Sequence, residues 1–257
     1  MAATRRLEVL AVPGLPMVQA GDALAALIAS GLAQGGIVPQ AHDVLVVAQK
    51  IVSKAEGRMV DLATVTPSPR AEALAAEVGK DPRLVEVILS ESVRVVRARP
   101  GLMIMEHRLG FVMANAGVDR SNVAPQDGAE RALLLPLDPD ASAEALRAAL
   151  SAQYGVPLAV VINDSFGRAW RRGTVGVAIG AAGLPSLLDL RGNPDLFGRT
   201  LEVSITGLAD EIAAAASLLM GQGAEAQPVV LVRGLDWSAP AAPAAALVRA
   251  AAEDLFR

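Results

Sequence analysis

Two separated segments of the sequence place carboxylates and a hydroxyl where they could hold a hard metal ion. Asp164 and Ser165 follow an apolar run, and Asp119 and Asn122 follow a tight turn that Gly117 permits. Oxygen ligands of this kind suit Mg²⁺ or Mn²⁺ rather than a soft metal. If the two aspartates come from the ends of separate strands, they can share one cation that also binds water and substrate phosphates.

Three arginines, Arg168, Arg171 and Arg172, follow Asp164 within eight residues. A planar guanidinium group can donate two parallel hydrogen bonds to a phosphate or carboxylate, which favours Arg over Lys at such a site. The alternative interpretation is a polar loop with solvated charges. For the Asp119 segment, the alternative is a turn followed by a helix N-cap. The pattern by itself leaves both interpretations open.

Two of the three lysines in the chain, Lys50 and Lys54, follow the apolar run 43–49. Because they are four residues apart, they share one face if this segment is helical. They could contact phosphate, although no glycine-rich phosphate loop accompanies them. The turn 12–18 (VPGLPMV) and the glycines after residue 220 (MGQG) offer backbone groups to a ligand. A plain loop is the alternative for the first segment, and the glycines of the second also suit a helix C-cap.

Buried strands and amphipathic helices must position these side chains. Continuous apolar runs predict strands at 43–49, 158–163 and 228–234, and a shorter run predicts another at 7–12. Helical spacing of apolar residues predicts helices over 21–33, 68–80, 81–92, the second part of 133–153, 209–221 and the C-terminal tail.

Residues that favour helix starts support several of these predictions. Asp22 is expected to cap the first helix, and a Ser or Asp followed by Pro opens the helices at 68–80 and 81–92. Asp210 and Glu211 would complement the dipole of their helix. Short β-like runs with turn residues between them occupy the middle of the chain, and 201–206 predicts a strand. These short runs interrupt a simple βαβ repeat, so we predict an α+β (mixed α/β) fold with no P-loop and no Rossmann fold.

The composition of the 257-residue chain narrows the class of protein. Its length allows one domain or two interlocked subdomains. A net charge of -4 and 3% aromatic residues argue against a nucleic-acid surface or an anionic membrane surface. The absence of cysteine from the sequence excludes disulfides and thiolate metal sites. His42 and His107, the two histidines, are too few for a His-rich zinc site, and each is expected to be solvated.

The sequence also bears on membranes and location. Every apolar stretch of the roughly 20 residues needed to cross a bilayer is broken by Gly, Pro or charge. The N-terminal segment is a poor signal peptide, because Pro13 and Gly14 interrupt its short apolar run. We therefore expect a cytoplasmic protein that does not enter membranes.

Taken in order, these segments resemble one protein family over nearly the whole chain. The order runs from GLP near the N-terminus through DVLVVAQKIVSKAEGR, GFVMANAGVDRSNV, NDSFGRAWRRGTVGVAIG and ADEIAAAASLLMGQ to VVLVRGL. The combination of NAGVDRSNV with DSFGRAWRRG is more specific than any single motif. The sequence resembles the coenzyme F-420-0:L-glutamate ligase (gamma-glutamyl ligase) family.

The resemblance implies a ligase that uses GTP and a divalent metal to attach L-glutamate to the deazaflavin precursor F-420-0. The amide would form through an acyl phosphate that the glutamate amine attacks, and further glutamates would join through the γ-carboxylate. Metal and arginines would offset the charge on the transferring phosphoryl group, which gives catalytic roles to Asp164, Arg168 and Arg172. The resemblance also implies a homodimer and two intertwined subdomains, one of them formed roughly by residues 90–200.

The resemblance further implies the residues that bind nucleotide and metal. Mg²⁺ or Mn²⁺, as one or two ions per site, would be bound by Asp119, Asp164, Ser165 and Gln222. Nucleotide contacts would come from Leu15, Pro16, Met17, Val18, Gln49, Lys50, Lys54, Asn122, Met220, Gly221, Gln222, Gly223, Ala224, Glu225, Ala226 and Gln227. Lys54 is the expected phosphate contact.

Two departures from the family pattern qualify this assignment. Relatives carry small hydroxyl residues in place of Gln49 and Lys50, so the contacts there are expected to differ. Relatives also tend to have an acidic residue in place of Gln222, and a neutral amide is a poorer Mg²⁺ ligand. Two alternatives remain for the function. One is a related carboxylate–amine ligase that acts on another acid, and the other is a non-catalytic nucleotide-binding module.

Overall fold

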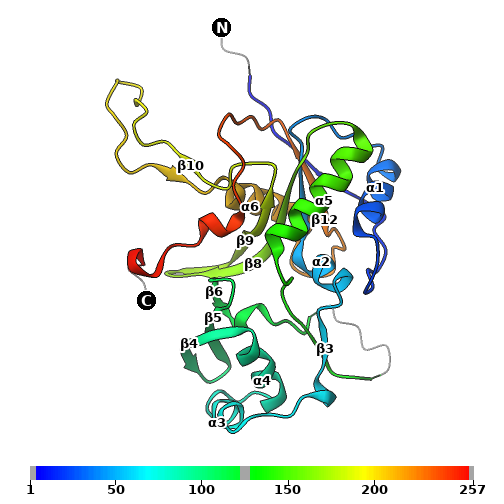
Figure 1. Cartoon of the computed structure of the whole chain (residues 1–257), viewed down its shortest axis with the longest axis vertical. Coiled ribbons are helices and arrows are strands. Elements are labelled where there is room, and N and C mark those ends of the chain that lie inside the picture. The colour runs from blue at the N-terminus through cyan, green and yellow to red at the C-terminus, as the bar shows by residue number, and fades with distance from the viewer. Residues whose placement is uncertain (1–3, 122–127, 255–257) are drawn as a thin grey trace.

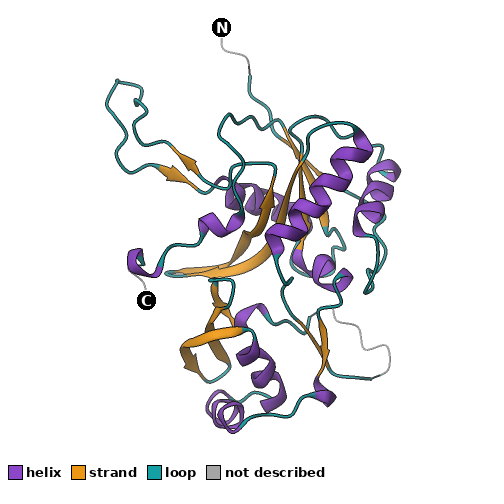
Figure 2. Ribbon diagram, viewed as in Figure 1, coloured by secondary structure: helices purple, strands orange, loops and turns teal. Residues whose placement is uncertain are grey.

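The computed structural model describes residues 4–121 and 128–254. The chain forms a larger part around a main β-sheet and a smaller part of helices and short strands below it (Figures 1 and 2). Helices and strands are mixed along the chain without a regular βαβ repeat. This arrangement confirms the predicted α+β fold.

Five strands of the described chain form the main sheet, in the order β1, β12, β2, β8, β9. Their bounds are Glu8–Ala11, Val229–Arg233, Val44–Ala48, Ala159–Arg168 and Arg171–Ala182, respectively. Strand β12 is antiparallel to both of its neighbours, and β2 is parallel to β8. Strands β1, β2 and β8 therefore run in one direction, and their carboxyl ends lie at the same edge of the sheet.

Helices cover both faces of the main sheet. These helices are α1 (Leu24–Gln34), α2 (Gln49–Ala55) and α5 (Pro139–Tyr154) on one face and α6 (Leu208–Met220) on the other. Successive residues of β2 alternate between the two resulting cores: Leu45 and Val47 face the first, and Val44 and Val46 face the second. A strand buried on both faces reads as a continuous apolar run, which is why the sequence predicted it.

The smaller part has its own apolar core, which includes Leu62, Ile88, Met103 and Met105. Its elements are β3 (Met59–Asp61) paired with β7 (Arg131–Leu133), α3 (Pro69–Val78), α4 (Pro82–Ser90), β4 (Ser92–Arg99), β5 (Leu102–His107) and β6 (Val112–Ala114). Ser68 and Asp81 cap α3 and α4 as predicted. Whether residues 90–200 form a subdomain stays a prediction.

Two predictions about helices are wrong. Asp22 does not cap α1, because its carboxylate accepts a hydrogen bond from the Gln19 N–H in the preceding turn. The predicted tail helix consists of two short 3₁₀ segments, Ala244–Leu247 and Ala251–Glu253. Asp140 of α5 accepts hydrogen bonds from the first of these segments, so tertiary contacts rather than helical periodicity hold the tail.

The predicted strand 201–206 is also too long. Only Ile205–Thr206 is a strand, β11, and it pairs with β10 (Leu188–Asp189) at the base of a protruding hairpin arm. Residues 190–204 of the arm belong to none of the three apolar cores, so little apolar burial favours a longer ladder there. Among the described residues, no helix is both long and apolar enough to cross a membrane.

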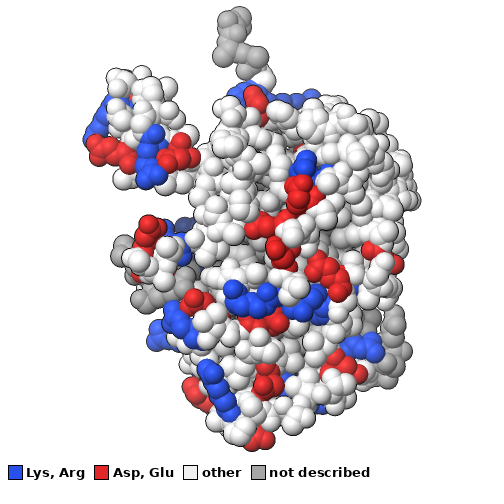
Figure 3. Space-filling model, in the orientation of Figure 1, with Lys and Arg blue, Asp and Glu red and all other residues white. Residues whose placement is uncertain are grey.

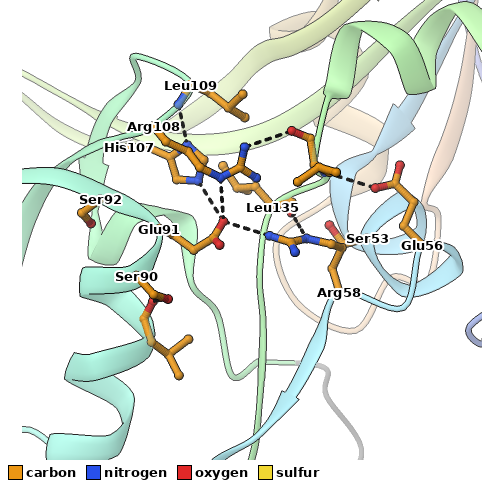
Figure 4. Close-up of polar contacts among 12 residues, drawn as sticks. Ser53, Glu56, Arg58, Ser90, Glu91, Ser92, His107, Arg108, Leu109 and Leu135 are labelled. Atoms are coloured by element: carbon orange, nitrogen blue, oxygen red, sulfur yellow. Dashed lines mark hydrogen bonds and ion pairs between the residues drawn. The ribbon is translucent and has the colours of Figure 1, made fainter. Parts of the chain in front are cut away.

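A partly buried ionic cluster lies between the smaller part and the core that packs on the main sheet (Figure 4). Oε2 of Glu91, between α4 and β4, accepts a hydrogen bond from Arg58 at 2.9 Å and contacts Nε of Arg108 at 3.3 Å. Arg58 follows α2 and also donates to the backbone carbonyl of Leu135 at 2.9 Å. We call Glu91, Arg58, His107 and Arg108 the Glu91 junction.

His107 is fully buried in this junction, so the prediction that it is solvated is wrong. Its Nδ1 accepts a hydrogen bond from the Leu109 N–H at 3.0 Å, which leaves the proton of the neutral ring on Nε2. Nε2 lies 3.4 Å from Glu91 Oε2, which is long for a hydrogen bond, and has no closer partner in the described chain. Burial alone would raise the pKa of Glu91, but the His107 contact and the charges of Arg58 and Arg108 lower it to about 2.

Candidate functional site

A cavity of about 400 Å³ lies at the carboxyl edge of the parallel strands. Its wall is formed by residues 15–18 after β1, the first residues of α2 after β2, residues 163–165 of β8, and the segment 220–228 that leads from α6 into β12. Ligands of open α/β sheets bind at this edge because the chain leaves the strands there to form surrounding loops. The topology therefore assembles one cavity from segments that are far apart in the sequence.

Most of the predicted site residues line this cavity. They are Leu15, Pro16, Met17, Val18, Gln49, Lys50, Lys54, Asp164, Ser165, Met220, Gly221, Gln222, Gly223, Ala224, Ala226 and Gln227. Asp119 lies beside the wall, in contact with Lys50, and Glu225, Arg168 and Arg172 are outside the lining. Asn122 falls outside the described residues. These residues therefore lie around one cavity, and what each of them binds stays a prediction.

Asp164 is a partly buried carboxylate that faces the cavity. Its Oδ1 accepts a hydrogen bond from the Ser165 N–H at 2.8 Å, and no other donor within the described chain reaches it. Burial raises the pKa of Asp164 to about 6, and the negative charge of Asp119 adds to this effect while Lys50 opposes it. Asp164 therefore has no ion-pair partner within the described chain, and the charge of Lys50 does not compensate for its burial.

Asp119 has such a partner within the chain. Nζ of Lys50 lies 2.7 Å from its Oδ2 and 2.6 Å from the hydroxyl of Ser121, which in turn donates to Asp119. Burial alone would raise the pKa of Asp119, but the hydrogen bonds from Lys50 and Ser121 outweigh it and the pKa lies below the ordinary value. Asp119 is therefore ionised at neutral pH.

The backbone that presents Asp119 adopts an unusual conformation. Asn115, Ala116 and Gly117 have consecutive positive φ angles of 52°, 52° and 71°. This region costs a non-glycine residue on the order of 1–3 kcal/mol, so the surrounding structure must enforce it. A Cβ atom on Gly117 would lie 2.8 Å from Cγ of Leu135, so close packing as well as φ requires glycine there. Strain of this kind is typical of functional segments.

Helix α2 places the two lysines at the cavity, as their spacing predicted. The helix begins directly after β2, and Gln49 is buried at its start with Oε1 accepting from the Ser53 hydroxyl at 2.9 Å. Lys50 and Lys54 both line the cavity. Burial, and then the charge of Lys50, lower the pKa of Lys54. Two cationic side chains at the end of a parallel strand favour an anionic ligand.

The loop after α6 supplies backbone groups to the opposite wall. Gly221 ends the helix with a φ of 69°, which confirms the predicted glycine C-cap. The carboxylate of Glu225 turns back onto its own loop, where Oε2 accepts from the Gly223 N–H at 2.8 Å. Hydrogen bonds from backbone N–H groups lower the pKa of Glu225. Glu225 therefore stabilises the loop conformation in this structure.

Two residues of the cavity lining carry orphaned acceptors. Asn163 donates through Nδ2 to the Ser217 hydroxyl at 3.0 Å, but its buried Oδ1 has no donor within the described residues. The same is true of the buried Oε1 of Gln227. Buried acceptors without donors are costly, which points to a ligand that donates to them. Asn163 is missing from the sequence-based prediction, although a polar residue at the end of an apolar run was a signal for it.

The arginines lie at the far end of a strand that is longer than predicted, because β8 does not end at residue 163. Strand β8 continues to Arg168 and forms a hairpin with β9, which corrects the predicted strand end. Arg168 donates to the backbone carbonyl of Arg172 at 3.4 Å, and its buried Nη1 has no partner within the described chain. Because a strand advances about 3.3 Å per residue, Arg168 is roughly 13 Å beyond Asp164. Catalytic roles for Arg168 and Arg172 stay predictions.

The donor set at the cavity fits a hard cation that shares its ligands with an anionic substrate. Nowhere in residues 4–121 and 128–254 do three His, Cys, Asp or Glu side chains gather into a metal cluster. Asp119 and Asp164 offer two carboxylates, Ser165 a hydroxyl and Gln222 an amide. Mg²⁺ commonly takes one or two carboxylates and completes its octahedron with water and phosphate oxygens. The residues present therefore fit such an ion.

Fold and cavity together define an α+β protein with a carboxylate- and lysine-lined ligand site at the ends of parallel strands. Comparison with known protein families identifies the family to which the chain belongs. The chain belongs to the F420-0:Gamma-glutamyl ligase family, whose model matches residues 14–234. This matched region contains all four segments of the cavity wall. Coenzyme F-420 is also written F420, as in this family description.

Individual relatives are similar over nearly their whole length. The coenzyme F420:L-glutamate ligase of Methanothermobacter thermautotrophicus is 48% identical over 231 residues, which cover 90% of each chain. The coenzyme F420:L-glutamate ligase of Methanopyrus kandleri is 46% identical over 261 residues, which cover 99% of this chain and 98% of that protein. The Methanocaldococcus jannaschii protein of the same name is 38% identical over 255 residues, or 98% of each chain.

Proposed function

We propose that the protein is a GTP- and divalent-metal-dependent ligase in coenzyme F-420 biosynthesis. It would add L-glutamate to F-420-0 and then further glutamates through the γ-carboxylate. Family membership supports the ligase activity. One observation carries the rest of the proposal: Asp164, an unpaired carboxylate, faces a cavity beside the ionised Asp119 and two lysines.

The proposed reaction has two steps, and both concentrate negative charge. A carboxylate oxygen of F-420-0 attacks the γ-phosphorus of GTP, and GDP leaves, which gives an acyl phosphate. The free amine of glutamate then attacks the acyl carbon, phosphate leaves, and the nitrogen loses its proton to give the amide. Lys50 and Lys54 would hold phosphate oxygens in the cavity, and Arg168 and Arg172 would hold a more distant anionic group.

We assign the metal to Asp119 and Asp164. A bound Mg²⁺ or Mn²⁺ would supply positive charge that neutralises phosphate oxygens during transfer. A second ion would depend on Ser165 and Gln222, which carry no formal charge. The charges of the donor set therefore favour one tightly bound ion over two.

We also propose a homodimer. The arm between β10 and β11 projects from the body of the molecule (Figures 1 and 3). Leu196 and Phe197 on this arm are 99% and 96% exposed, and Trp170 at the tip of the β8–β9 hairpin is 89% exposed. Large apolar side chains gathered on protruding segments are typical of surfaces that a partner covers. Light scattering that gives the mass of one chain would contradict the dimer.

The activity is tested by incubation with GTP, Mg²⁺ or Mn²⁺, L-glutamate and F-420-0, followed by mass spectrometry. The expected product is F-420-0 with one or more glutamyl residues, formed with stoichiometric GDP. Folded enzyme that adds no glutamate contradicts the proposal. Addition to another carboxylic acid would identify a related ligase. Metal-independent GTP binding without turnover, measured by calorimetry, would indicate a non-catalytic nucleotide-binding module.

A further inference from the structure

Strand β9 contains a β-bulge directly opposite the site residues of β8. Along the hairpin, Ile162 pairs with Gly180, but the next residue, Asn163, pairs with Ala178, so Ile179 is an extra residue in β9. A bulge of this kind bends the strand pair and increases its twist, which re-aims the side chains that follow. The residues that follow on β8 are Asn163 and Asp164. The bulge therefore helps to set how these side chains enter the cavity.

Asp210 of α6 contacts the residue next to this bulge. Its Oδ1 accepts a hydrogen bond from the Ala178 N–H at 2.9 Å. Burial raises the pKa of Asp210, and the Ala178 hydrogen bond opposes the effect. The neighbour Glu211, in the first turn of the same helix, is exposed. The helix dipole favours an acidic residue at either position. It does not explain why Asp210 accepts a hydrogen bond from Ala178.

The same helix also contacts β8 at the register partner of Ala178. Ser217, two turns after Asp210, accepts a hydrogen bond from Asn163 at 3.0 Å. Close packing between helix and strand is possible because residue 176 is glycine: a Cβ there would lie 2.2 Å from the Ser217 hydroxyl oxygen. Helix α6 therefore contacts both members of the Asn163–Ala178 pair, one through Ser217 and the other through Asp210.

We propose that Asp210 is a positioning residue of the ligase, which fixes the β9 bulge so that Asp164 faces the metal and nucleotide. This inference rests on the proposed function. Asp210 would touch neither metal nor substrate, and its effect would pass through Ala178 and the strand pair. Removal of the Asp210 carboxylate should therefore weaken metal binding at Asp164 by more than the accompanying loss of protein stability explains. The amide of asparagine can also accept a hydrogen bond, so Asn should replace Asp210 at little cost.

The test compares Asp210→Ala, Asp210→Asn and Asp140→Ala in the full chain. Asp140 makes a comparable contact with β9, because its Oδ1 accepts from the Ala181 N–H at 2.8 Å, beyond the bulge from Asp164; it also accepts from Ala244 and Ala245 of the tail. Mn²⁺ affinity in the presence of GDP is measured by electron paramagnetic resonance at a temperature where all variants are folded. Partners that orient metal ligands typically contribute about 10–100-fold to metal affinity. We expect a loss of that size in Asp210→Ala only.

Amide hydrogen exchange at Asn163 and Asp164 provides a second readout that does not depend on the activity. Faster exchange at these positions is expected in Asp210→Ala and not in Asp140→Ala. Equal losses of Mn²⁺ affinity in Asp210→Ala and Asp140→Ala, no rescue by Asn, or unchanged exchange would overturn the positioning role. A wild-type protein that binds neither Mn²⁺ nor GDP would contradict the proposed function, and exchange at Asp164 would still decide whether Asp210 fixes the bulge.

Discussion

Asp164 and Glu91 are carboxylates in two regions of the molecule, and burial acts on both in the same direction. The pKa of Asp164 is nevertheless raised to about 6, and that of Glu91 is lowered to about 2. The difference comes from the neighbours. Glu91 has Arg58 and Arg108 within 3.3 Å, whereas Asp164 accepts only a backbone N–H among the described groups.

This comparison separates a carboxylate with cationic partners inside the chain from one whose ionised form a bound cation would stabilise. At the Glu91 junction the positive charges belong to the chain, so folding itself stabilises the carboxylate. At the cavity Lys50 pairs with Asp119, and its charge does not outweigh the burial that raises the pKa of Asp164, so a bound cation would further stabilise the ionised pair of Asp119 and Asp164. Burial therefore says little about function until the partners of the buried group are known. The following predictions test this distinction.

The largest effect is expected from Asp164→Asn. Removal of the carboxylate should lower kcat/KM on the order of 1,000-fold or more, because the metal would lose a charged ligand. The melting temperature without metal should stay equal or rise, since a poorly stabilised charge is removed. Kinetics and calorimetry measure the two effects. Asp236→Asn, at an exposed position outside the cavity lining, is the control. Full activity of Asp164→Asn would show that the metal site is misplaced.

The second prediction concerns Glu91→Gln. This change leaves two partly exposed guanidinium groups without their carboxylate, and the loss of stability should amount to about 3 kcal/mol at most. Urea unfolding measures the loss, and activity per folded molecule should be unchanged. Glu144→Gln, which breaks an exposed pair with Arg147, should cost less than about 1 kcal/mol. A small loss for Glu91→Gln would mean that the junction does not hold the two parts together.

The third prediction follows from the sign of the Glu91 shift. The folded-state pKa of about 2 lies below the ordinary value of 4.5, so the stabilisation is fully present above pH 4.5. It is lost as the pH falls from 4.5 through about 2, and it amounts to about 3 kcal/mol at most. Unfolding curves of wild type and Glu91→Gln should therefore converge in this range. Parallel curves would refute the assigned shift.

The smallest effect is expected from Lys50→Met. The Lys50–Asp119 pair is partly exposed, so its loss should cost the fold less than about 1 kcal/mol. Nucleotide affinity should fall about 10-fold, because a cationic group would be missing from the phosphate site. Calorimetric titration with GTP and Mg²⁺ measures this, and Lys80→Met, in the smaller part, is the control. Unchanged affinity would place the phosphates elsewhere in the cavity.

Much of the fold could be predicted because the signals are local. Ser68 and Asp81 cap their helices through neighbouring N–H groups, and the doubly buried strands read as apolar runs. The sheet order could not be predicted in this way, since it depends on pairs such as β1 with β12. The same holds for β8, whose extension to Arg168 requires the partner β9. Its hairpin tip has Trp170 at a φ of 64°, without the Asn-Gly or Asp-Gly signal of a tight turn.

The site shows the same division. Ordered motifs, through the resemblance, predicted most residues that line the cavity. Contacts between distant side chains were not predictable: the orphaned oxygen of Asn163, the burial of His107 and the Asp210–Ala178 hydrogen bond each arise from tertiary packing. These contacts decide the pKa values and the orientation of the reactive groups.

The position of β12 in the main sheet has a consequence for how the protein is made. This strand lies between β1 and β2, although most of the described chain separates it from them in the sequence. During synthesis from the N-terminus, β1 and β2 lack the strand that pairs with both of them until β12 has left the ribosome. Pairs this distant in sequence also close slowly. The unfilled sheet exposes strand edges in the meantime, so folding yield should respond to translation speed and chaperones more than the stability of the finished molecule suggests.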